Sequence, residues 1–76
     1  MSSKAELLLN ILHSEYVKRV NSNENYTDDS ARMFNISELC DTYNLEHALV
    51  DELAHELKQY GYIQKWITGT IVLLGD

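Results

Sequence analysis

The sequence contains no proline, three glycines and one cysteine, and it has six basic residues against twelve acidic ones. A single cysteine, Cys40, excludes an internal disulfide framework and the structural zinc sites that need several thiolates. No apolar stretch approaches the roughly 20 residues that span a bilayer, and Met1-Ser-Ser-Lys4 does not start a secretory signal peptide. We therefore expect a cytoplasmic protein with no membrane partner. The shortage of basic residues also disfavours nonspecific attraction to the phosphates of nucleic acid.

The chain does have enough apolar sequence for one core. Its 76 residues are 45% hydrophobic and 24% charged, with a net charge of −6, and this composition is typical of globular domains. A chain of this length cannot divide its apolar residues between two cores, so residues 1–76 should form a single domain. We expect a stability of about 3–5 kcal/mol, which dimerisation would supplement.

Residues 5–20 are predicted to form an amphipathic helix. Apolar side chains recur at steps of three and four residues along one face, namely Ala5, Leu8, Leu9, Leu12, Tyr16 and Val20. Leu7 and Ile11 lie four residues apart on nearly the opposite side, where a surface helix usually carries charge. They are either two scattered exposed apolar side chains, which are common on proteins, or a contact for a second chain in a homodimer.

The middle of the chain begins with a polar connecting loop at 21–30 and a short strand within 31–36. Asn35 is placed to cap a short helix over Ile36–Tyr43. Asn44 is suited to a left-handed turn, so this helix should end there and a second one should start directly after a tight turn.

A second periodic run predicts a longer helix at residues 45–60, followed by a terminal hairpin. Its apolar positions are Leu45, Leu49, Val50, Leu53, Ala54 and Leu57. Gly61 supplies the left-handed residue that ends the helix. Two β-prone runs, 62–67 and 70–74, then flank Thr68-Gly69, and the sequence leaves open whether that turn has two residues or three with a glycine bulge.

This order of elements resembles the winged helix-turn-helix domain, an α+β fold of three helices with a C-terminal β-hairpin wing and a short strand before the second helix. The resemblance rests on Ile36-Ser-Glu-Leu-Cys-Asp-Thr-Tyr-Asn44, on Leu49, Val50, Leu53 and Leu57, and on Tyr60-Gly-Tyr-Ile63. It implies that the helix from about Glu46 to Tyr60 is a recognition helix that enters the DNA major groove, while the wing touches the adjacent backbone or minor groove.

The outward side of that helix departs from the family's pattern. Its six outward positions, four of them acidic, are Glu46, His47, Asp51, Glu52, His55 and Glu56. Each carboxylate close to a phosphate would oppose binding by roughly 1 kcal/mol. The wing residues Lys65, Trp66 and Ile67 bring a single positive charge. We therefore expect this helix to present a negatively charged side that repels duplex DNA.

The remaining polar residues do not predict a catalytic, cofactor or metal site. His47 and His55 lie eight residues apart on one helix, too far to hold one metal ion without another element. Cys40 is expected to be a small buried apolar residue rather than a nucleophile. Trp66 either packs into the core or anchors a partner near the wing tip. A solvated acidic surface, rather than a divalent-ion face, is the favoured interpretation of Asp51, Glu52, His55 and Glu56.

Three functions stay open, and none involves a small-molecule ligand. The leading hypothesis is a small non-enzymatic winged-helix regulatory module that contacts protein, either itself or another macromolecule, through its acidic helix and wing. The second is a DNA-binding transcriptional regulator, which the resemblance favours and the charge of the helix opposes. The third is an acidic mimic of DNA that occupies a basic site on another protein.

Overall fold

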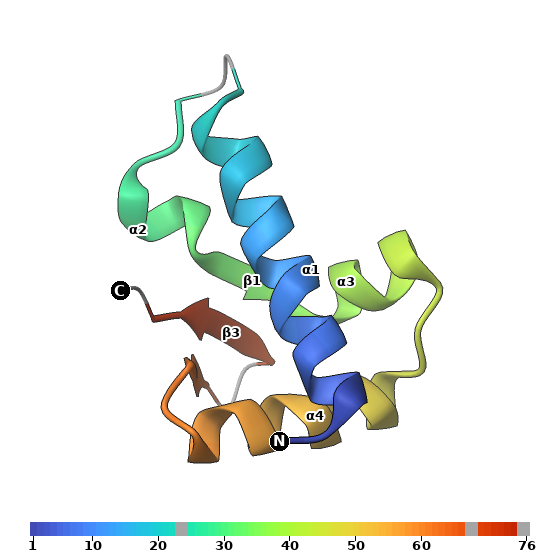
Figure 1. The fold of residues 1–76 in the computed structure, drawn as a ribbon. Coiled ribbons are helices and arrows are strands. Elements are labelled where there is room, and N and C mark those ends of the chain that lie inside the picture. Colours follow the sequence, from blue (N-terminus) through green and yellow to red (C-terminus); the bar gives the residue numbers. More distant parts are fainter. Residues whose placement is uncertain (23–24, 67–68, 75–76) are drawn as a thin grey trace.

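The computed structural model describes residues 1–22, 25–66 and 69–74, in which four helices pack with a small antiparallel sheet (Figure 1). In chain order the elements are α1 (Ser3–Val20), α2 (Asp28–Ala31), β1 (Met33–Asn35), α3 (Ile36–Tyr43), α4 (His47–Gln59), β2 (Ile63–Lys65) and β3 (Thr70–Leu73). The predicted α+β class is confirmed, with one helix more than the three expected.

The sheet has the order β1-β3-β2, so the last strand of the chain lies in its centre. β2 and β3 form the predicted hairpin, with Ile63 opposite Leu73, while β1 pairs with the other edge of β3. Gly69 has a φ of 84°, as the glycine-bulge alternative for the hairpin turn requires. The predicted strand at 31–36 thus joins the hairpin in one sheet, and this places the start of α3 beside the hairpin.

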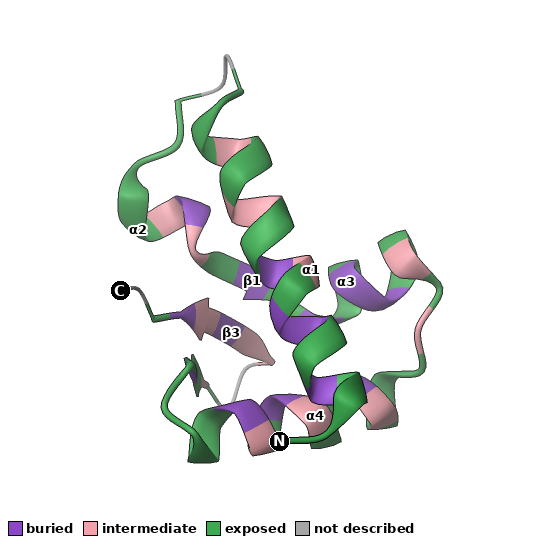
Figure 2. Cartoon of the chain, in the orientation of Figure 1, coloured by how far each residue is buried: buried purple, intermediate pink, exposed green. Residues whose placement is uncertain are grey.

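The core lies between α1, α3, α4 and one face of the sheet, where the ribbon segments coloured as buried in Figure 2 face one another. Leu12 of α1, Leu57 of α4 and Ile71 of β3 have no exposed surface. The predicted apolar face of α1 is buried as far as Leu12, but Val20 at its end is 53% exposed. Val20 is therefore not a core residue.

The tight turn between α3 and α4 has the predicted chemistry. The Asn35 side chain accepts a hydrogen bond from the Glu38 amide at 3.2 Å, which caps α3. Asn44 is left-handed with a φ of 55°, and the next amide, that of Leu45, donates to the Cys40 carbonyl at 2.9 Å. α4 begins at His47, later than predicted, because the residue before it still has an extended backbone.

The connecting segment contains a helical turn, α2, that was predicted as loop. Thr27 and Ser30 form a capping box, in which each side chain accepts from the backbone amide of the other, and this reciprocal capping starts the turn. Asp28 then accepts hydrogen bonds from the Tyr16 hydroxyl at 2.6 Å and from Arg32 at 3.1 Å. These contacts hold α2 against α1.

Across the described ranges, no helix combines the length and the apolar character that a membrane crossing requires.

Candidate functional site

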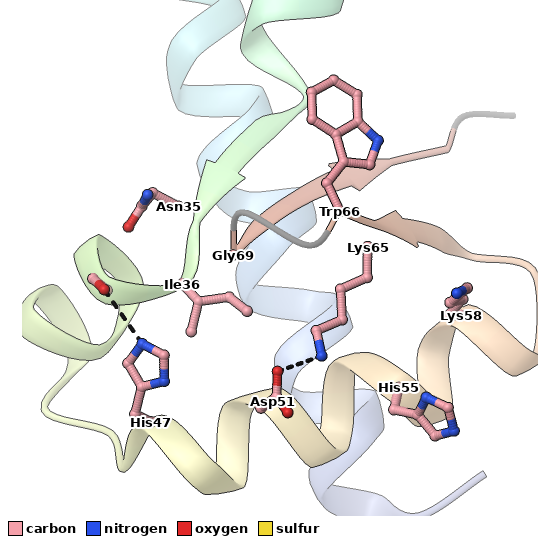
Figure 3. A pocket seen from close by; sticks show the side chains of 10 residues that line it. Asn35, Ile36, His47, Asp51, His55, Lys58, Lys65, Trp66 and Gly69 are labelled. Carbon is pink, nitrogen blue, oxygen red and sulfur yellow. Dashed lines mark hydrogen bonds and ion pairs between the residues drawn. The ribbon is translucent and has the colours of Figure 1, made fainter.

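A hollow lies between α4 and the hairpin, and it is called here the polar groove. It has a volume of about 470 Å³ (Figure 3). It is lined by the junction of β1 and α3, by one side of α4 and by the hairpin. The lining residues are Asn35, Ile36, Ser37, His47, Asp51, His55, Lys58, Lys65, Trp66 and Gly69.

An ion pair between α4 and the hairpin crosses the polar groove. Lys65 Nζ contacts Asp51 Oδ1, as Figure 3 shows. The hydrogen bond from Lys65 lowers the pKa of the Asp51 carboxyl, and the charges of Lys65, His47 and His55 act in the same direction. Asp51 is therefore ionised throughout the neutral range, but its charge is matched by the lysine beside it.

The other polar contacts of the groove are longer, and they involve two exposed histidines. His47 Nε2 lies 3.3 Å from Ser37 Oγ, and His55 Nε2 lies 3.4 Å from the Gln59 side-chain nitrogen. Lys58 is exposed on the same side of α4. The groove therefore holds two lysines and two histidines against one carboxylate.

The four carboxylates that the sequence assigns to the negatively charged side of the third predicted helix, α4, have different surroundings. Asp51 faces the hairpin, whereas Glu56 turns toward the start of α1 and accepts from the Ser2 amide at 2.6 Å and from the Ser2 hydroxyl at 3.0 Å. The hydrogen bond from the Ser2 backbone amide lowers the pKa of the Glu56 carboxyl. Glu46 and Glu52 are exposed. Tertiary contacts thus engage two of the four carboxylates, Asp51 at the hairpin and Glu56 at the start of α1.

A second hollow, called here the apolar groove, lies between α1 and the first half of α4. It has a volume of about 180 Å³, and seven of its eight lining residues are apolar. These seven are Leu7, Leu8, Ile11, Leu45, Leu49, Val50 and Leu53. The eighth is Lys4, which the sequence did not place beside α4.

The apolar groove brings the predicted Leu7 and Ile11 patch together with residues assigned to the core. Leu7 is 62% exposed at the margin of the groove, whereas Ile11 is half-buried against the core. Leu49 and Leu53, predicted as core, are also half-buried and complete the opposite wall. Leu49 and Leu53 are four residues apart on α4, as Leu7 and Ile11 are on α1. Both spacings can be read from the sequence, but only the packing of α1 against α4 shows that the two pairs line one groove.

Trp66 is not a core residue. It is 47% exposed, and its side chain points away from α4 in Figure 3. It also lines a shallow hollow with Met33 and Val72 on the outer face of the sheet. Of the alternatives for this residue, packing in the core is wrong. Ile67, the third residue assigned to the wing, lies outside the described residues.

The remaining candidate residues have structural settings. Cys40 is buried in the core, and this burial raises the pKa of its thiol. Within the described part of the chain, His, Cys, Asp and Glu side chains do not gather in groups of three or more that could hold a metal ion.

In comparisons with known proteins, no family model, no curated protein and no solved structure matches the chain.

Proposed function

We propose that this chain is a small non-enzymatic regulatory module with a winged-helix arrangement and that it acts by binding another protein. The order helix, strand, helix, turn, helix and hairpin is compatible with that arrangement. The observation that carries the proposal is the apolar groove, an open apolar hollow beside the exposed carboxylates of α4.

The apolar groove is unusual on a chain with a net charge of −6. Single exposed apolar side chains need no explanation, but an apolar hollow bordered by charged residues is the common composition of a protein contact surface. Its volume of about 180 Å³ is also below the ~300–1,000 Å³ of small-molecule pockets, so it fits one or two anchoring side chains.

A peptide-display selection on the immobilised full chain tests this function. We expect enriched peptides to bind the wild type and to lose at least about tenfold in affinity for Leu7→Asp, because an introduced carboxylate opposes apolar burial. Leu7 is exposed, so circular dichroism should show an unchanged fold. Selected peptides that bind both proteins equally would count against the groove as the contact surface.

DNA binding is the second candidate, and the composition of the polar groove is the observation that favours it. Lys58 lies on the side of α4 that faces the hairpin, and Lys65 of β2 lies across the groove from it. Asp51, the carboxylate in the same groove, is paired with Lys65. Fluorescence anisotropy of a labelled mixed-sequence duplex at low salt separates the two functions. Micromolar binding that falls steeply with salt and weakens in Lys58→Gln would favour DNA and contradict our proposal.

The acidic DNA mimic has less support than either function. A mimic needs carboxylates along one continuous side, whereas Asp51 is paired with Lys65 and Glu56 is bound to Ser2.

A further inference from the structure

We infer that the apolar groove is a docking site for an amphipathic helix of a partner protein whose apolar stripe is flanked by lysine or arginine. This inference rests on the proposed protein-binding function and adds the chemistry of the partner.

The walls of the apolar groove favour a helical occupant. α1 contributes Leu7 and Ile11 to one wall, and α4 contributes Leu49 and Leu53 to the other. The buried side chains of Leu8 and Val50 lie among them and belong to the core. A partner helix that enters a hollow between two helices presents apolar residues at steps of three and four positions, the usual mode of helix-in-groove recognition.

The charges beside the groove define the flanks of that helix. Glu46 and Glu52 each lie three residues from Leu49, and Glu56 lies three residues from Leu53. Residues at this spacing within α4 are neighbours on its surface, so Glu52 and Glu56 border the α4 wall of the groove, and Glu46 lies just before the helix. Lys4 is the basic residue among the groove's lining side chains. Because Lys4 would repel basic residues of the partner, these would lie on the α4 side of the groove, near Glu46 and Glu52.

The same charges disfavour a second copy of this chain as the occupant. In an isologous dimer the same surface of each copy faces the other, so each copy would bring its own Glu46, Glu52 and Glu56 to the contact. Each chain also carries a net charge of −6, so long-range repulsion opposes the encounter. A basic partner is attracted by the same field, which leaves it as the better occupant.

The test uses a fluorescently labelled helical peptide of about 18 residues, long enough to be helical, with a leucine stripe flanked by lysines. A scrambled peptide of the same composition removes the stripe, and a third peptide replaces the lysines with glutamates. We expect micromolar affinity for the first, at least about tenfold weaker binding of the scrambled peptide, and no binding of the acidic one at low salt.

Two matched protein variants distinguish the effect of acidic residues beside the groove on peptide binding from the effect of the protein's net charge. The double variant Glu46→Gln and Glu52→Gln should bind the lysine-flanked peptide about three- to tenfold more weakly than the wild type. The affinity of this variant should also depend less on salt concentration. Glu56 is left intact because it holds the start of α1. The control combines Asp29→Asn with Glu38→Gln, two exposed acids that do not line the groove. It makes the same change in net charge and should alter affinity by less than about twofold.

Several outcomes would overturn the inference. Equal loss in the groove variant and the control variant would show attraction to net charge rather than docking. Failure of the lysine-flanked peptide, while display-selected peptides still bind and still require Leu7, would refute the basic helix and leave the proposed function standing. A dimer seen by light scattering that excludes the peptide and dissociates in Leu7→Asp would make a second copy the occupant. DNA binding without any peptide binding would remove both proposals.

Discussion

Two leucines of α1, Leu7 and Leu12, differ strongly in burial, so the same substitution should have a large effect on stability at one and almost none at the other. Leu12 has no exposed surface and lies in the core with Leu57, whereas Leu7 is 62% exposed at the margin of the apolar groove. Truncation of a fully buried leucine to alanine costs about 2–5 kcal/mol, because apolar contact is lost and a cavity remains. Leu7→Ala should change stability by less than about 0.5 kcal/mol.

These magnitudes are large relative to the whole domain. A chain of this size is expected to be stable by about 3–5 kcal/mol, so Leu12→Ala should remove most of that stability. Urea unfolding followed by far-UV circular dichroism measures the difference. With a slope of about 1 kcal/mol per molar urea, a loss of about 3 kcal/mol lowers the unfolding midpoint by about 3 M. The folded baseline of Leu12→Ala should then nearly disappear, while Leu7→Ala should overlay the wild type.

Two results would refute this reasoning. A cost below about 1 kcal/mol for Leu12→Ala would mean that α1 does not pack on α4 as described. An equal cost for Leu7→Ala, growing with protein concentration, would mean that a second copy covers Leu7 in solution.

Three further predictions concern single residues. Asn44→Ala should be less stable than Asn44→Gly by about 1 kcal/mol in urea unfolding, because a β-carbon is unfavourable at a φ of 55° and glycine has none; equal stability would contradict the left-handed turn. Lys65→Gln should raise the pKa of Asp51 toward its ordinary value in an NMR titration. A carboxyl group whose pKa is lowered in the fold contributes stability above its unfolded-state pKa, and this contribution is lost as the pH falls through its folded-state pKa. The variant lacks most of this contribution, so it should lose less stability on acidification than the wild type. Burial should make the Cys40 thiol react far more slowly with a thiol reagent in buffer than in urea, and equal rates would show that the site is open.

Local chemistry explains why so much of the fold could be predicted. Asn35 and Asn44 delimit α3 by interactions with their own neighbouring backbone, and Gly61, with a φ of 83°, lies just beyond α4 for the same local reason. The capping box of Thr27 and Ser30 also depends on neighbouring residues only, but it lies within a run of polar residues that is typical of a loop. Val20 was misassigned because helical periodicity continues past the end of the core.

The candidate sites were harder to predict, because charge and exposure depend on which surfaces meet. The acids of α4 could be counted from the sequence, but whether Asp51 is paired depends on where the hairpin places Lys65. Trp66 could belong to either face of the hairpin until the strand register was known. Leu7 and Ile11 were identified as an apolar pair, but the wall opposite them comes from α4, more than thirty residues further along the chain.

The sequence by itself determined the class of the fold, the positions of the predicted helices, the strand before α3 and the hairpin, because caps, turns and periodicity act within a few residues. The tertiary structure decided that Asp51 pairs with Lys65, that the sheet has β3 at its centre, and that two half-exposed apolar pairs meet in a groove. Those features depend on packing between distant segments, whose relative placement no local pattern encodes.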